Sequence, residues 1–556
     1  MGRAALDSAE GTISDRPVVV NPGESCNLLV GGPETWKVQS VDDLSILGTG
    51  ITLDRARALR TLRNASGVQV GVAVAIKVAS DAAPGARALR LRVGDQSVAS
   101  TGGIVVTARS LPVQTLYFPY LLSSSDQYTG LAIANPSPAP AVVRVTARGE
   151  QGDLLYEEEA VVPADLAVAG GAQTAQLAGQ IFNLTSTARQ SGSVTIVSDN
   201  KSVASFFLTG DLKGNYLDGA EAFTRAYRQL YFVDVLQNLS TATELHLQNV
   251  KDAAVTVALT LTDGNGTILG STATRTIPAG GKLGESVSSL FSYSADLQSA
   301  HVKAVAPDDA IVGFAYVRQR DTVWGLNAQP IENALASLYS PQLAAGNFGI
   351  PFRTRLNVVN VGDSSAAVTI TVMSDAGDVL AGPSSAGVLV PGAHLTLDAA
   401  SFFDFAAATE GSLMITAPAG AKLLGNVVFG DGDPQNGGLE FGAALPLVGP
   451  GLSSFMFAQI AQGQGFYTGL AFLAPEGAEI KLEAFDPQGV SVGRGSVSLP
   501  AGGRRVSLLD ALIPETHGQV RGYVMVTATR PVIGFELFGA SDGRFLAAVV
   551  PQAVAK

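Results

Sequence analysis

The side chains that most often do chemistry in proteins are few in this sequence and lie far apart. The four histidines stand at positions 246, 301, 394 and 517, and there is one cysteine, Cys26. No two histidines have the i, i+4 spacing of a helical metal site, and a single cysteine excludes an internal disulfide and a multi-cysteine zinc site. We therefore expect isolated histidines at the surface or at strand edges, no cofactor and no catalytic residues.

Three acidic residues form the candidate metal site. Asp431, Asp433 and Glu440 could supply the oxygen ligands that calcium prefers. The favoured alternative is that such residues belong to hairpin turns, as in Asp263-Gly264-Asn265-Gly266, where position twelve counted from Asp263 is Thr274 and not the glutamate that closes an EF-hand loop. The sequence therefore predicts no resident metal.

Trp324 is the candidate ligand contact, because it is unique to its copy of the internal repeat and a tryptophan face can stack on a sugar ring. No Gly-x-Ser-x-Gly sequence and no glycine-rich phosphate loop stands between a strand and a helix, so we predict that the protein is not an enzyme. A pair of carboxylates acting on a glycosidic bond is the enzymatic alternative that the sequence leaves open.

Composition indicates many short strands joined by tight turns. Of the 556 residues, 46% are apolar and only 15% are charged, with 62 glycines and 27 prolines, and this length suggests several domains. The net charge of −12 argues against binding nucleic acid through a basic surface. No stretch approaches the 18 apolar residues of a membrane span, and the first twenty residues lack a signal-peptide core, so we expect an extracellular or cell-surface chain whose leader is not present in this sequence.

Four internal repeats follow a different first segment. Leu116-Tyr117-Phe118 recurs as Leu230-Tyr231-Phe232 and again from Leu338-Tyr339, and the segment 128–132 recurs at 467–471. The spacing predicts domains at 1–111, 112–229, 230–337, 338–451 and 452–556, and we call the last four repeats 1 to 4. The positions that recur, for which we expect structural roles, are Tyr117, Tyr231, Tyr339, Asn135, Asn249, Asn360, Gly152, Gly266, Gly377 and Gly489.

Each repeat passes through the same landmarks. A glycine closes a hairpin turn, a proline-glycine segment such as Pro278-Ala279-Gly280-Gly281 follows, then a short apolar segment and a last hairpin. Period-two alternation is also present before the repeats, where valine and isoleucine alternate over 68–78, as expected of a half-buried strand. These patterns predict β-sandwiches throughout.

Two resemblances to known bacterial modules rest on these residues. Residues 17–108, with Pro22-Gly23, the alternating valine strand and Asp81-Ala82-Ala83-Pro84-Gly85, resemble an Ig-like domain of the IPT/TIG kind. The four repeats, with their Leu116-Tyr117-Phe118-Pro119 opening and their hairpin turns, resemble tandem β-sandwich modules of bacterial surface and secreted proteins. The resemblance implies an extracellular structural or adhesive role and transfers no site residues.

The sequence thus predicts an all-β chain, a linear array of five antiparallel, Ig-like β-sandwich domains. Short linkers would make this a semi-rigid rod, a structural or adhesion protein that contacts a protein or glycan at a cell surface, or itself in a filament or layer. The alternatives are an array of carbohydrate-binding modules and a cryptic hydrolase.

Overall fold

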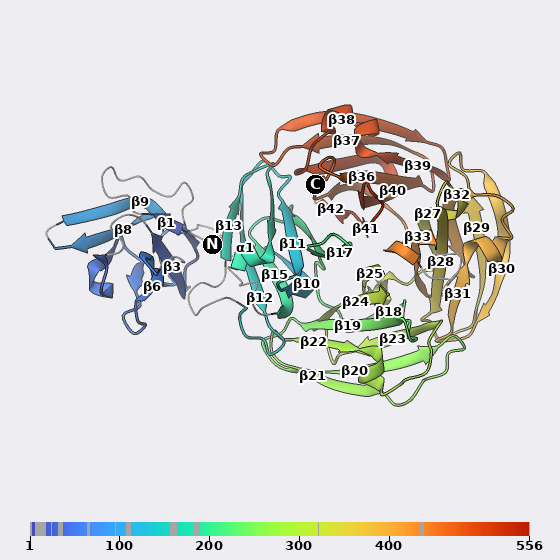
Figure 1. Cartoon of the computed structure of the whole chain (residues 1–556), viewed down its shortest axis with the longest axis horizontal. Helices are drawn as coiled ribbons and strands as arrows, with labels where there is room; N and C mark the ends of the chain where they lie inside the picture. Colours follow the sequence, from blue (N-terminus) through green and yellow to red (C-terminus); the bar gives the residue numbers. More distant parts are fainter. Residues whose placement is uncertain are drawn as a thin grey trace.

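The structure is a computed structural model of the whole chain. It describes residues 3–5, 18–23, 25–31, 37–63, 67–94, 96–106, 113–155, 164–182, 189–320, 322–432 and 439–554. In these ranges regular structure is almost entirely β-strand, and the α-helices have five residues or fewer. The predicted all-β architecture of antiparallel sandwiches is confirmed (Figure 1).

The N-terminal region forms a two-sheet unit of its own. One sheet has the order β1-β3-β7-β5 with β6 beside β7, and the other β2-β9-β8-β4. The predicted long strand is β7, whose Val72, Val74 and Ile76 are buried between the sheets, while Val70 near its start and Val68 just before it are exposed. The strands are β1 (Arg3–Ala5), β2 (Val18–Val20), β3 (Ser25–Gly31), β4 (Leu44–Leu47), β5 (Ile51–Leu53), β6 (Arg60–Arg63), β7 (Gln69–Val78), β8 (Gly85–Val93) and β9 (Gln96–Val106).

Repeats 1 and 2 share one topology. In repeat 1 the sheets have the orders β10-β15-β12-β13 and β14-β11-β16-β17, and in repeat 2 β21-β20-β23-β18-β26 and β22-β19-β24-β25. The elements are β10 (Gln114–Ser123), β11 (Gln127–Ala134), β12 (Ala141–Arg148), β13 (Ala164–Val168), β14 (Gln173–Leu177), α1 (Ala178–Phe182), β15 (Gln190–Ser198), β16 (Ala204–Asp211), β17 (Leu217–Glu221), β18 (Gln229–Phe232), β19 (Thr241–Asn249), β20 (Val255–Asp263), β21 (Ala273–Ile277), β22 (Lys282–Ser286), α2 (Val287–Phe291), β23 (Ala300–Val305), β24 (Ile311–Gln319), β25 (Thr322–Asn327) and β26 (Gln329–Pro330).

Repeats 3 and 4 follow the same plan, with long strands that join the two sheets. β27 pairs with β28 in repeat 3, and β40 belongs to both sheets of repeat 4. The elements are β27 (Ser337–Asn347), β28 (Pro351–Asn360), β29 (Ala366–Met373), β30 (Val379–Leu389), β31 (His394–Asp398), α3 (Ala399–Phe403), β32 (Thr409–Thr416), β33 (Leu423–Gly432), β34 (Leu439–Pro446), β35 (Leu452–Phe457), β36 (Phe466–Ala474), β37 (Ala478–Phe485), β38 (Ser491–Leu499), β39 (Gly503–Leu508), α4 (Leu509–Leu512), β40 (Tyr523–Ala540), β41 (Leu546–Val549) and β42 (Gln552–Ala553).

The four repeats do not lie in a line: they close into a ring (Figure 1). Repeat 4 packs against repeat 1 through a shared apolar cluster in which the Phe206 and Phe538 rings stack at 5.9 Å. The Tyr523 hydroxyl also donates to the Gly171 carbonyl at 2.7 Å. The predicted linear array is therefore wrong in its arrangement, because every repeat contacts two neighbours. The N-terminal sandwich lies outside this ring, beside repeat 1.

The ring is built from one joint used four times. We call the sheet that opens each repeat (with β10, β18, β27 or β35) its first sheet, and the other its second sheet. The first sheet of each repeat packs against the second sheet of the next, as Tyr120 of β10 does against His246 of β19 and Phe314 of β24. A head-to-tail interface of this kind gives either an open filament or a closed ring, and here the rotation between repeats closes it.

The recurring glycines lie at these joints. Gly152, Gly266, Gly377 and Gly489 all have φ between 81° and 87°, which favours glycine in their hairpin turns. Gly152, Gly266 and Gly377 also touch the proline-glycine segment of the next repeat, and Gly489 touches Gly171 in the turn before β14 of repeat 1. An added Cβ on any of the four would lie within 3.0 Å of a backbone oxygen there. In the three joints other than that of Gly489, the turn glycine and the proline-glycine segment are therefore the two halves of one joint.

A backbone hydrogen bond fixes the register of every joint. The amide of the first or second residue of β14, β22, β31 or β39 donates to a carbonyl in the hairpin turn of the preceding repeat, at 3.0 or 3.1 Å. The four donor–acceptor pairs are Lys282 to Glu150, His394 to Gly264, Arg504 to Asp375 and Gln173 to Pro487.

The recurring asparagines hold each sandwich together from inside. Asn135, Asn249 and Asn360 are fully buried, and each donates from Nδ2 to the carbonyl four residues later at 2.8 Å. Each also donates to a carbonyl of the strand or loop that follows the hairpin, which ties two connections at one end of the sandwich. Buried amides need such partners, and this explains their recurrence without a ligand.

Candidate binding site on the ring axis

Four strands, one from each repeat, surround the ring axis. We call β17, β25, β34 and β41 the axial strands; Figure 1 shows β17, β25 and β41 at the centre of the circle. Each lies at the edge of a second sheet. Small residues allow their close approach, and the buried Asp218 carboxylate of β17 accepts hydrogen bonds from the Gly219 amide and, across to β25, from the Gly325 amide. Burial raises the pKa of Asp218 well above its ordinary value.

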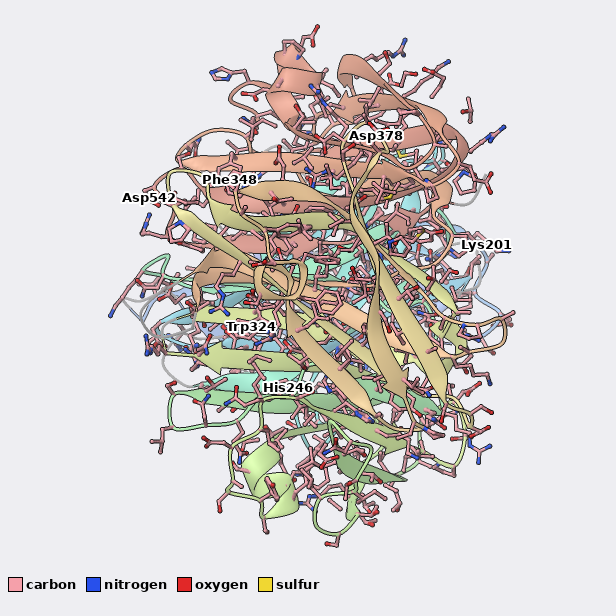
Figure 2. The ribbon with its side chains drawn as sticks, turned by 90° about the vertical axis from the view of Figure 1, so that its right-hand side faces the viewer. Lys201, His246, Trp324, Phe348, Asp378 and Asp542 are labelled. Carbon is pink, nitrogen blue, oxygen red and sulfur yellow. The ribbon has the colours of Figure 1, made fainter. Side chains whose placement is uncertain are left out.

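A cavity of about 510 Å³ lies at the C-terminal ends of the axial strands. All four repeats line it: Ala220 and Glu221 from β17, Asn327 from β25, Ala444 from β34 and Ala548 from β41 are among its walls. Exposed Thr224, Glu332 and Asn333 form its rim, so it is open to solvent. In Figure 2 the Phe348 and Asp542 loops mark one side of the ring, and Lys201 marks the other. The Lys201 loop leads into β16, and the first half of β16 pairs with the end of β17. Because the cavity lies at that end of β17, it is on the Lys201 side of the ring.

The polar groups of the wall include carboxyl groups and two buried amides. The only charged side chains among the described lining residues are those of Glu221 and Glu332. Asn327 is 9% exposed; its Nδ2 donates to the Glu221 carbonyl at 2.9 Å, while its Oδ1 has no hydrogen-bond partner. The Gln329 side chain donates from Nε2 to the Gly425 carbonyl and accepts at Oε1 from the Gly425 amide. Burial raises the pKa of the Glu221 carboxyl.

An apolar pocket of about 170 Å³ adjoins this cavity between repeats 3 and 4. Its walls include Pro446, Val448 and Val550, which the two cavities share, and Val532 and Phe535 beyond them. The site therefore combines an acidic part on the side of repeats 1 and 2 with an apolar part on the side of repeats 3 and 4.

The recurring tyrosines anchor the wall of the cavity. The backbone of Tyr117 exchanges hydrogen bonds with Phe223, and that of Tyr339 with Val448, while Tyr231 pairs with Gln329. These partners directly follow the axial strands and line the cavity. The backbones of these tyrosines therefore tie the wall to the first sheets.

Trp324 is not placed to meet a ligand at the surface. It is 1% exposed, its indole Nε1 donates to Asp234 at 2.8 Å, and the Arg355 guanidinium lies 5.5 Å from the ring centroid. Arg355 also donates to both oxygens of Asp234, at 2.7 and 2.9 Å. The candidate ligand contact is therefore a buried member of the joint between repeats 2 and 3 (Figure 2).

Three of the four histidines are buried rather than at the surface, and of these only His394 lies on an edge strand, β31. His246, His301 and His394 are at most 5% exposed and lie in joints, with the His301 and His394 ring centroids 6.0 Å apart. Burial lowers the pKa of all three, that of His301 to about 4. Only His517, 3.2 Å from Asp510, is exposed as expected.

The candidate metal site falls largely outside the described residues. Asp431 is a buried residue of β33, but Asp433 and the side chain of Glu440 are not described. Within the described ranges, no group of three His, Cys, Asp or Glu side chains is arranged to hold a metal ion. None of the helices described there has the length and apolar character needed to span a bilayer.

Sequence reasoning missed the axial strands and with them Glu221 and Asn327. A signal was present: Gly219, Gly325 and Gly442 each precede a short apolar or polar run, Pro330 and Pro551 follow two of the axial strands, and Pro446 ends a third. The loops before these strands differ in length between repeats, so a search at fixed offsets does not align them.

Comparison with known proteins adds little to this geometry. No family model and no curated protein matches the chain. Among solved structures it is similar to SGBP-B of the Bacteroides ovatus mixed-linkage glucan utilization locus, solved with a mixed-linkage heptasaccharide (10% identity, 55% of this chain and 73% of that one, TM-score 0.13). It is also similar to a glycoside hydrolase family 32 protein of Bifidobacterium adolescentis (8% identity, 78% and 95%, TM-score 0.13). Scores this low do not indicate a shared overall fold.

Proposed function

We propose that the protein is a non-catalytic recognition protein of the cell surface or extracellular space, in which the ring is a rigid binding head. The observation that supports this is the cavity on the ring axis, whose walls come from all four repeats. Ligand sites occur preferentially where structural units meet, and four converging strands hold the wall in a fixed geometry. The partner is a small molecule, or the exposed end of a glycan or protein that can enter the cavity.

Assembly of the repeats into a filament is not part of this proposal. In each joint the outer face of a first sheet is covered by the second sheet of a neighbouring repeat, as where Met456 of β35 shares an apolar cluster with Phe206 of β16 in the joint that closes the ring. The faces that a linear array would offer to other copies are therefore used within the chain.

A ligand screen with a blocked cavity tests the proposal. Thr224 is an exposed rim residue, so Thr224→Trp should close the mouth without disturbing a core. Leu239→Trp is the matched control, because Leu239 is fully exposed on a hairpin that does not line the cavity. We expect compounds or glycans that raise the unfolding temperature of the unaltered protein to lose this effect in the first variant and to keep it in the second. Hits that bind both variants equally would reject the axial cavity as the site.

Hydrolysis of a glycosidic bond is the second candidate function, because one cavity is lined by two carboxyl groups, Glu221 and Glu332. Burial raises the pKa of Glu221, as a general acid requires, while Glu332 is exposed at the rim. A panel of aryl glycosides tests this candidate: turnover that is abolished by both Glu221→Gln and Glu332→Gln would favour it over simple recognition.

A further inference from the structure

We propose that the ligand of the axial cavity is a small organic cation, a protonated amine that carries an apolar body. This inference rests on the proposed function of the cavity as a binding site and names the chemical class that the site selects.

The charge of the wall is the first argument. Glu221 and Glu332 are the charged side chains among the described lining residues, and no lysine, arginine or histidine is among those residues. A carboxylate in a partly buried cavity attracts a cation and repels an anion more strongly than it does at an open surface, because screening by water is weaker there. Anionic ligands are therefore disfavoured.

The hydrogen-bonding capacity of the wall is the second argument. The donors of the two buried amides are already used, by Asn327 on the Glu221 carbonyl and by Gln329 on the Gly425 carbonyl. The Asn327 Oδ1 is an acceptor without a partner, and the Glu221 carboxylate is another acceptor nearby in the wall. An ammonium group offers three donors and no acceptor, whereas a sugar hydroxyl offers both. The wall matches the ammonium.

The mouth of the cavity already holds a cation of the chain itself. The Arg225 guanidinium lies 4.7 Å from the centroid of the Tyr227 ring, and Tyr227 lines the cavity. A hydrogen bond with Tyr227 raises the pKa of Arg225, and the negative charges of Glu332 and Asp309 add a smaller effect in the same direction. A positive charge is thus stabilised at this entrance, where the Phe223 and Tyr227 rings stand edge to face at 6.0 Å.

The adjoining pocket selects the rest of the ligand. Its walls are apolar, with Val532, Phe535 and Val550 among them, and it opens from the same cavity on the far side from Glu221. A ligand that places its ammonium against Glu221 and Asn327 can bury an alkyl or aryl group there, and removing that apolar surface from water favours binding.

Three probes of equal length test the inference: n-hexylamine, 1-hexanol and hexanoate, titrated calorimetrically into the full chain at pH 7. We expect hexylamine to bind at one site per chain, at least tenfold more tightly than hexanol, with no measurable binding of hexanoate. Glu221→Gln, which keeps the shape of the side chain, should weaken hexylamine binding at least tenfold. Glu479→Gln removes the same charge from the exposed face of strand β37, away from the lining residues, and should leave binding unchanged. Denaturant unfolding of both variants verifies that they are folded.

The outcomes separate the two proposals. Equal binding of the three probes, tighter binding of hexanoate, or hexylamine binding that Glu221→Gln leaves unchanged would overturn the cationic ligand. If neutral sugars bind and Thr224→Trp abolishes their binding, the recognition function stands and the cationic ligand is overturned. If neither the probes nor any screened compound binds, both fall.

Discussion

Gly377→Ala should weaken the ring through one joint, and the size of its effect can be worked out from the structure. Gly377 has φ of 87° in the hairpin turn of repeat 3, and a Cβ there would lie within 3.0 Å of the Ala501 carbonyl oxygen of repeat 4. It would also lie 3.2 Å from the Gly502 carbonyl carbon and 3.2 Å from the Gly503 nitrogen. The substitution therefore adds a left-handed backbone residue and a collision between repeats.

Gly420 offers a matched control in the same repeat. Its φ is 88°, and an added Cβ would have no atom within 4 Å. Gly420→Ala therefore carries only the cost of a left-handed alanine, about 1–2 kcal/mol. Gly377→Ala carries the same cost plus about 1–3 kcal/mol for overpacking the joint. The difference between the two variants isolates the contact between repeats.

Chemical denaturation followed by tryptophan fluorescence measures this difference, since Trp324 is buried in the neighbouring joint. We expect Gly377→Ala to lower the unfolding free energy by roughly 1–3 kcal/mol more than Gly420→Ala. Small-angle X-ray scattering should show a larger radius of gyration if the joint opens. Gly266→Ala should be milder, because its Cβ would be 2.9 Å from the Pro391 oxygen. Equal effects of Gly377→Ala and Gly420→Ala would refute the joint.

Three further predictions concern buried charged or titratable groups. Glu536 is fully buried and neither carboxyl oxygen has a hydrogen-bond partner, so Glu536→Val should stabilise the protein by about 1–3 kcal/mol. Burial raises the pKa of Glu536 well above its ordinary value, so the folded state keeps a proton that the unfolded state loses above about pH 4.3. The gain in unfolding free energy from Glu536→Val should therefore be larger at pH 8 than at pH 4. Denaturant titrations that give the same gain at both pH values would contradict this. Asp234→Ala should cost about 3–5 kcal/mol, because it leaves the Arg355 guanidinium in the joint without its carboxylate; a loss under 1 kcal/mol would show that the pair is dispensable. Burial lowers the pKa values of His301 and His394, so both are neutral in the folded joint. Their contribution to the unfolding free energy should therefore be lost as the pH falls below about 6.5, and for His301 this loss should extend down to about pH 4. His301→Gln should reduce the change of unfolding free energy with pH, and an unchanged pH dependence would contradict this prediction.

The sequence was sufficient to predict the sandwiches but not their arrangement. Period-two alternation and turn glycines act within a few residues, so strands such as β7 and hairpins such as the one closed by Gly152 are visible locally. The joint depends on a contact between that glycine and Ala279, 127 positions later, in another repeat. Local rules contain no information on such a contact, and short linkers are compatible with a rod and with a ring.

The candidate site escaped prediction for a related reason. Glu221 and Asn327 are ordinary polar residues at strand ends, and the glycines two positions before them do not by themselves mark the two residues as neighbours. They meet only because β17 and β25 converge at the axis. Trp324 is a candidate because tryptophan is rare in this chain. A residue that occurs in one repeat alone can also serve a single joint, and here Trp324 is matched to Asp234, which likewise occurs in one repeat alone.

The order of the repeats in the ring is specified by side chains that differ at one equivalent position. Four polar residues, one in each second sheet and each at most 6% exposed, occupy it: Gln173, Lys282, His394 and Arg504. Each has a different partner in the preceding repeat. The Lys282 ammonium lies 5.0 Å from the Tyr120 ring, and Arg504 donates to Asp375 at 2.7 Å.

These differences penalise every incorrect pairing of repeats. The backbone contacts of the four joints are alike, so by themselves they would allow any first sheet to pack against any second sheet, within the chain or between chains. A mismatch would leave a buried cation such as Arg504 without its carboxylate, at a cost of several kcal/mol. Burial already lowers the pKa of Lys282 to about 8, because the negative charges near its ammonium only partly offset the loss of hydration. A chain with four interchangeable joints would polymerise as readily as it closed, whereas four distinct ones favour the single closed ring in which the axial cavity forms.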